Sequence, residues 1–232
     1  TGQRNDERVS PPFGFDADDE EPMKRNTLFL VAVFAASLLL MALEKPIFLL
    51  WYHAQAAQAS VSELALVVWN GLKLDLTVAG YITALPLLVV LAAVWLPGGW
   101  GRTVLKVYFL FIAAVAAIVF AANLALYEYW AFPLDSSVLQ YLASPKEAMA
   151  SVTAGQLLLQ LLVALAAFAV MAWCYLRLLR LFDARRRPVH PMWSTLGMLL
   201  LAGVLFLPIR GGVSVATANV SKVYFSGRMF LN

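Results

Sequence analysis

Charge is scarce in this sequence. Lys, Arg, Asp and Glu together make up 13% of its 232 residues, whereas hydrophobic residues make up 62%. The mean hydropathy is +0.76, and a water-soluble domain of this length cannot bury so much apolar surface. The composition therefore excludes a sizeable soluble domain and favours several membrane spans of roughly 20 residues each.

Cysteine and catalytic motifs are nearly missing as well. The single cysteine, Cys174, excludes an intrachain disulfide and a multi-cysteine metal site. His53 and His190 fall on opposite membrane faces in the topology derived below, so they cannot share a metal ion. No acid, base and nucleophile spacing or phosphate-binding loop is present. We therefore expect no catalytic residue, metal ligand or cofactor in this chain, and no nucleic-acid partner, because its basic residues gather at the ends of apolar segments.

What the chain does contain is a series of five long apolar segments. They predict an all-α, polytopic membrane protein with residues 1–23 as a disordered cytoplasmic tail, residues 24–209 as the transmembrane domain and residues 210–232 as an extracytoplasmic connector. Aromatic and charged residues alternate between 127 and 153, which is typical of short amphipathic helices on a membrane surface. Pro46 and Pro86 predict kinks in the first two spans. The predicted spans lie near residues 28–50, 66–96, 104–126, 155–176 and 192–209.

Three basic clusters set the orientation, because Lys and Arg beside short loops favour the cytoplasm. With five spans, all three clusters fall on one side of the membrane, so the N-terminus is predicted to be cytoplasmic and the C-terminus extracytoplasmic. The clusters are Lys24 with Arg25, Arg102 with Lys106, and Arg177, Arg180, Arg185, Arg186 and Arg187. The five arginines could also bind anionic lipids, although topology alone explains them.

A few charged residues fall close to membrane depth, where a charge needs a partner, water or a ligand. Lys73 and Asp75 are two residues apart on one helix, so they point apart and need partners on other helices. Either they bind a lipid headgroup, or both lie in the headgroup layer, where Lys73 snorkels and Asp75 caps a helix or pairs with a residue such as Arg210. Glu44 and Lys45 either line a similar headgroup site or mark the end of a span.

Several short motifs together resemble one family of membrane enzymes. Residues 71–81 (GLKLDLTVAGY) are similar to the second-span signature of lipoteichoic acid synthase-like proteins, in the sulfatase and alkaline phosphatase superfamily. Residues 126–130 (LYEYW) and 139–145 (LQYLASP) resemble their external loop. The connector that follows their fifth span is similar to residues 208–212 (PIRGG), 223–226 (VYFS) and 230–232 (FLN).

The resemblance implies a role in a larger bacterial inner-membrane protein. Five helices would anchor an external domain, absent from this chain, that uses a divalent metal (Mn or Mg) and a threonine nucleophile on phosphate or sulfate esters. This chain alone would position that domain at phospholipid headgroups without catalysing a reaction. The anchor of a phosphoethanolamine transferase is the sister alternative. A small transporter, with polar residues or broken helices at the midplane, and a structural scaffold that binds a partner through small residues are the rivals from other classes.

Overall fold

The computed structural model describes residues 17–96, 98–130, 153–182 and 191–210, and these ranges contain helices and no strands. Five of these helices are long and apolar enough to cross a membrane, which confirms the predicted helical fold and agrees with the five predicted spans. A single turn of helix, α2 (His53–Ala56), lies between the first and the second of these long helices in the chain. The long helices are α1 (Ala17–Trp51), α3 (Val61–Trp95), α4 (Trp100–Trp130), α7 (Ala154–Leu178) and α8 (Pro191–Arg210).

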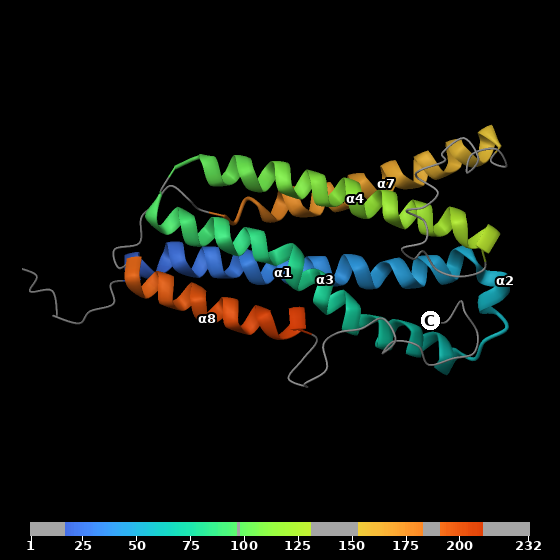
Figure 1. The fold of residues 1–232 in the computed structure, drawn as a ribbon, viewed down its shortest axis with the longest axis horizontal. Helices are drawn as coiled ribbons and strands as arrows, with labels where there is room; N and C mark the ends of the chain where they lie inside the picture. Colours follow the sequence, from blue (N-terminus) through green and yellow to red (C-terminus); the bar gives the residue numbers. More distant parts are fainter. Residues whose placement is uncertain (1–16, 97, 131–152, 183–190, 211–232) are drawn as a thin grey trace, which may run out of the picture.

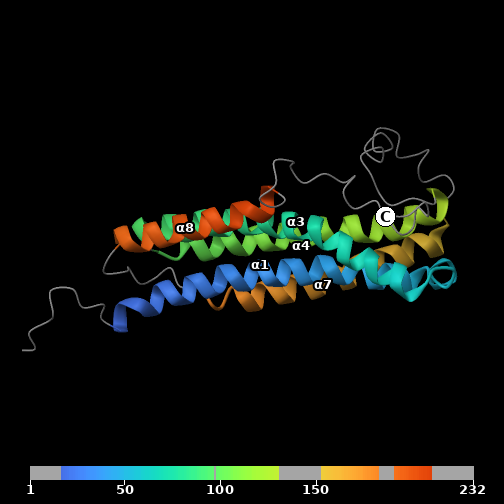
Figure 2. The same cartoon turned by 90° about the horizontal axis from the view of Figure 1, so that it is seen from below.

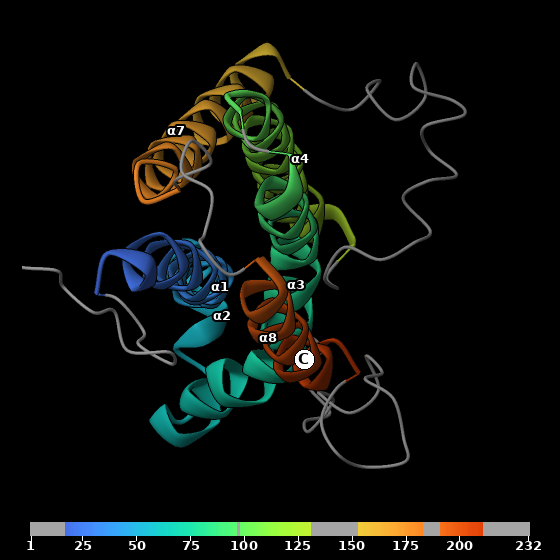
Figure 3. The same cartoon turned by 90° about the vertical axis from the view of Figure 1, so that its left-hand side faces the viewer.

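The five long helices run lengthwise, side by side, and neighbours in the chain point in opposite directions (Figures 1 and 2). Helix α3 packs between α1 and α8, while α4 packs mainly on α7. Seen end-on, α4 and α7 form a pair on one side, with α1, α3 and α8 on the other (Figure 3). The starts of α1, α4 and α8 and the ends of α3 and α7 share one end of the bundle, called the basic end below because Arg25, Arg102 and Arg177 stand there.

Each predicted span lies on one of these helices to within one residue. Two predictions at the margins need correction. Helix α1 begins at Ala17, so residues 17–23 of the predicted disordered tail are helical; acidic residues in a first turn suit the positive end of the helix dipole. Residues 127–130 extend α4 rather than starting a surface helix, and the rest of the predicted surface helices, at 131–152, lies outside the described residues.

The interior joins the two groups of helices through aromatic side chains. Phe109 of α4 stacks on Tyr175 of α7, with ring centroids 4.9 Å apart, and Phe29 of α1 meets Phe109 edge-on at 6.3 Å. The Tyr175 hydroxyl is 3.0 Å from the Ser37 hydroxyl of α1, so this buried polar pair is hydrogen-bonded. The hydroxyls of Ser37 and Tyr175 therefore satisfy each other within the apolar core.

Helix α3 continues through Pro86, and α4 supplies the hydrogen bond that the proline removes. Proline lacks an N–H, so the carbonyl of Ile82, four residues earlier, has no partner within its own helix. The Tyr108 hydroxyl donates to that carbonyl at 2.9 Å. In lipid, where water cannot replace a lost bond, this contact lets a proline remain inside a spanning helix.

Tyr108→Phe should therefore lower the free energy of unfolding by about 1–3 kcal/mol, the cost of leaving a buried acceptor unbonded. Thermal unfolding of the purified protein in detergent measures the change. Tyr81→Phe, at an exposed position, is the matched control and should have little effect. In a Pro86→Ala background, residue 86 regains its N–H, so the Tyr108→Phe effect should shrink; an undiminished effect would contradict this explanation.

Candidate functional site

An ion pair joins α1 to α3. The Nζ atom of Lys45 lies 2.6 Å from both carboxylate oxygens of Asp75. The Asp75 side chain is 9% exposed and that of Lys45 is 22% exposed. The prediction that Asp75 needs a partner on another helix is confirmed, and the partner is Lys45 rather than Arg210.

Gly71 makes room for this ion pair. It precedes Asp75 by one helical turn, on the face of α3 that meets α1. A Cβ atom at this position would come within 1.9 Å of Lys45 Cε and 2.8 Å of Lys45 Cδ. The Lys45 stem therefore crosses α3 through the gap that the glycine leaves. Lys45, Gly71 and Asp75 together are called the polar junction below.

Gly71→Ala should displace Lys45 from Asp75 without unfolding the helix. Alanine favours the helix over glycine by about 1 kcal/mol, so any net loss of stability reports the broken ion pair. We expect a net loss of about 1–2 kcal/mol in chemical unfolding, since the flexible lysine can move aside while a buried bonded charge loses its partner. Gly203→Ala, where a Cβ meets nothing within 4 Å, should instead be neutral or stabilising. Equal behaviour of the two variants would contradict the role given to Gly71.

The polar junction lies about one bilayer core away from the basic end. Lys45 follows Arg25 by 20 residues and Asp75 precedes Trp95 by 20, which is about 30 Å of helix in each case. Burial in α3 also begins here: its first buried residue is Gly71, and the preceding turns leave the bundle (Figures 1 and 3). A buried ion pair at this level matches the boundary between hydrocarbon and headgroups.

The last turn of α8 is fixed to α3 at the same level. The Thr77 hydroxyl donates to the Pro208 carbonyl at 3.0 Å, one of the carbonyls that a helix C-terminus leaves without a partner in its own helix. One turn along α3, Gly80 lets Ile209 approach so closely that an added Cβ would lie 2.6 Å from Ile209 Cγ1. Arg210, the last described residue, therefore begins from an anchored position.

The other charged candidates do not join the ion pair. Lys73 is exposed and donates to Asn70 Oδ1 at 3.3 Å. Arg210 is exposed and bonds to none of the described residues. Glu44 shares a face of α1 with Ser37 and Phe48, toward α7 and α4, and its Oε1 is buried without a hydrogen-bond partner. Of these candidates, Lys45 alone is paired with Asp75 in the part of the chain that the structure describes.

An aromatic cluster joins α1 to α4 beyond the polar junction. The rings of Phe48 and Tyr127 are 4.9 Å apart and those of Tyr52 and Tyr127 are 4.7 Å apart, while the Tyr52 hydroxyl donates to the Leu124 carbonyl. Burial, followed by the negative charge of Glu128, raises the pKa of Tyr52 to about 12. Its hydroxyl is therefore a protonated donor throughout the neutral range.

The predicted anionic-lipid cluster is described only in part. Arg177 lies in the last turn of α7, its guanidinium 5.3 Å from the ring centroid of Trp173, and Arg180 follows in an exposed turn. Arg185, Arg186 and Arg187 lie outside the described residues, as does His190. Within the described ranges no group of three His, Cys, Asp or Glu side chains comes together as metal ligands.

Sequence reasoning missed both the Lys45–Asp75 pairing and the two glycines that allow close packing. A usable signal for the pairing was present, since both residues stand 20 positions from the basic ends of adjacent antiparallel helices. The glycines carry no such signal, because their neighbours, Lys45 and Ile209, come from other helices. Comparison of the chain with protein-family models, curated proteins and solved structures gave no match.

Proposed function

We propose that this chain is the membrane anchor of a lipoteichoic acid synthase-like enzyme of the bacterial inner membrane, and that it positions an extracytoplasmic catalytic domain at phospholipid headgroups. The motif resemblance supplies the enzyme class, and the divalent metal and threonine nucleophile would belong to that other domain. The basic end would face the cytoplasm. The phosphoethanolamine transferase anchor is the sister alternative.

The fixed end of α8 is the observation that carries this proposal. Helix α8 directly precedes residues 211–232 in the chain, and its last turn is held to α3 by the Thr77–Pro208 hydrogen bond and the Gly80–Ile209 contact. Helix α3 is held to α1 in turn by the Lys45–Asp75 ion pair. A domain attached through this connector would thus start from a defined height above the bilayer, as an enzyme acting on headgroups requires.

The helices themselves favour an anchor over a small transporter. Transporter sites are typically built from interrupted helices near the midplane, whereas α1, α3, α4, α7 and α8 each run without a break. Buried Thr83 bonds to the Ala79 carbonyl of its own helix, and buried Ser37 bonds to Tyr175. These polar groups are therefore occupied by internal bonds rather than facing a solute path.

Sequencing the coding region downstream of Asn232 tests the proposal directly. We expect an open reading frame that encodes a metal-dependent phosphatase-like domain, and a stop codon at once after Asn232 would contradict it. An alkaline phosphatase reporter fused after Asn232 should be active, because this enzyme requires export, and a fluorescent reporter at the same point should stay dark. The opposite pair of readings would place the C-terminus in the cytoplasm and reject the arrangement.

A further inference from the structure

Glu44 is a third ionisable residue at the level of the polar junction, and it takes no part in the ion pair. It precedes Lys45 in α1, but adjacent residues of a helix point about 100° apart. Lys45 therefore reaches α3, whereas Glu44 faces α7 and α4 (Figure 3). The Glu44 side chain is half-buried, and its Oε1 atom is buried without a hydrogen-bond partner among the described residues. Glu44 thus lacks the bonds that Asp75 has.

The charges around Glu44 do not supply a counterion. Lys45 and Asp75 act on it electrostatically, but they neutralise each other, because the Lys45 ammonium bonds both oxygens of Asp75. Tyr175 of α7 and Tyr127, in the aromatic cluster with α4, are titratable as well, although a tyrosine is uncharged at neutral pH. An ionised Glu44 would therefore be a negative charge without a counterion among the described residues.

The Glu44 carboxyl also lies on the hydrocarbon side of the polar junction. Side chains of a helix lean toward its N-terminus, and the N-terminus of α1 stands at the basic end (Figure 1). The carboxyl thus extends from the level of the junction into the bundle. Hydrocarbon has no water to solvate an ionised carboxylate, whereas a protonated carboxyl is neutral and has a single hydrogen to donate.

Tyr175 offers Glu44 an acceptor rather than a donor. The Ser37 hydroxyl donates to the Val33 carbonyl at 2.8 Å, so its 3.0 Å bond with Tyr175 uses the tyrosine hydrogen. The Glu44 carboxyl is close enough to the Tyr175 hydroxyl to act on it electrostatically. An ionised Glu44 could only accept, and that hydrogen is already used. A protonated Glu44 instead has a hydrogen to donate, and the Tyr175 oxygen keeps a lone pair to receive one.

We propose that Glu44 is a proton-binding site, and that the protonated carboxyl is the place where this protein reacts with hydrophobic carbodiimides. The carboxyl proton moves to one nitrogen of the reagent while the carboxylate oxygen bonds to its central carbon. The acyl group then moves from that oxygen to nitrogen, so the new carbon–oxygen bond to the acyl carbon breaks as a carbon–nitrogen bond forms. No group leaves, and the protein gains the whole mass of the reagent. The site does not depend on the proposed anchoring of a catalytic domain.

Infrared difference spectroscopy of the purified chain in detergent tests for the proton. The carbonyl stretch of a protonated carboxylic acid is separate from the bands of ionised carboxylates. We expect the wild-type spectrum minus that of Glu44→Gln to contain this acid band at neutral pH. Glu128→Gln, at an exposed carboxyl of α4, is the matched control and should not remove the band. An acid band that survives in Glu44→Gln, or is missing from the wild type, would overturn the proposal.

Labelling of the wild-type chain with dicyclohexylcarbodiimide, followed by peptide mass spectrometry, tests the modification site without any substitution. We expect the peptide with Glu44 to gain the mass of the reagent, and those with ion-paired Asp75 and exposed Glu128 to remain unchanged. The labelling should be lost as the pH is raised, because the reaction needs the proton.

A water-soluble carbodiimide with an added amine is the opposite probe, and it should modify Glu128 and spare Glu44. Equal modification of the two residues by this reagent would show an ordinary hydrated carboxylate at Glu44 and reject the proposal. A Glu44 that dicyclohexylcarbodiimide leaves unlabelled would reject the modification site, even where the acid band is present.

Discussion

Lys45→Met should be the most destabilising single substitution of a charged residue among the described helices, at about 3–5 kcal/mol. It leaves the Asp75 carboxylate, which is 9% exposed, with no partner for either oxygen. Asp75→Asn should cost less, because Lys45 is 22% exposed and its flexible stem can carry the ammonium group toward the headgroup layer. Lys45→Met should therefore cost more than Asp75→Asn, because the charge that it leaves without a partner is the more deeply buried of the two.

Unfolding of the purified variants in mixed detergent micelles, followed by circular dichroism, gives both free energies. Lys106→Met, which removes an exposed lysine of α4, is the control and should change stability by no more than about 0.5 kcal/mol. The double variant Lys45→Met with Asp75→Leu should recover most of the loss, since it removes both charges. An additive double variant would mean that the two side chains do not interact in the folded protein.

Gly80→Leu should have the second-largest effect, a loss of about 2–3 kcal/mol with local release of the end of α8. Even a Cβ atom at this position would stand 2.6 Å from Ile209 Cγ1, and the Ile209 backbone nitrogen lies 3.5 Å from the same point. A leucine must therefore push α8 away from α3 and break the Thr77–Pro208 hydrogen bond. Gly80→Leu should therefore lower the free energy of unfolding and also displace the last turn of α8, which carries Arg210.

Gly203→Leu is the matched control for this substitution. Gly203 lies on α8 itself, and an added Cβ meets nothing within 4 Å. It should be neutral or slightly stabilising, since leucine forms helices better than glycine. Spin labels at Tyr81 and Phe206, both exposed, would report a larger distance between α3 and α8 in Gly80→Leu only. An unchanged distance would contradict the role of Gly80.

The helices could be predicted from sequence because lipid imposes a simple rule on their composition. Roughly 20 apolar residues per crossing is a local property, so each span was found on the correct helix. The end of α4 was placed too early, because Tyr127 and Glu128 read as interfacial although Tyr127 packs against Phe48. Local polarity does not reveal such a contact.

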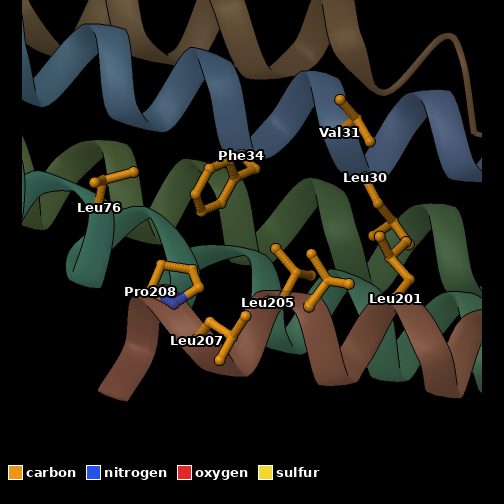
Figure 4. Close-up of a pocket in the computed structure, with 9 residues that line it drawn as sticks. Leu30, Val31, Phe34, Leu76, Leu201, Leu205, Leu207 and Pro208 are labelled. Carbon is orange, nitrogen blue, oxygen red and sulfur yellow. The ribbon is translucent and has the colours of Figure 1, made fainter. Parts of the chain in front are cut away.

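The candidate site could be predicted only in part, for a similar reason. Burial cost identified Asp75 as a residue that needs a partner, but helix periodicity cannot say which neighbouring helix supplies it. Arg210 was the suggested partner, and the structure has Lys45 there, reached across Gly71. The apolar groove between α1 and α8 (Figure 4) could not be foreseen at all, because it arises from α1 and α8 both packing on α3.

Cysteine labelling in sealed, right-side-out vesicles tests most directly the orientation of the bundle, with the basic end inside. In a Cys174→Ser background, a membrane-impermeant reagent should modify Ala57→Cys, an exposed position between α2 and α3, and should not modify Gly99→Cys between α3 and α4. Lysis of the vesicles should make both positions reactive. Modification of Gly99→Cys alone, or of both positions before lysis, would contradict the orientation that the proposed anchor requires.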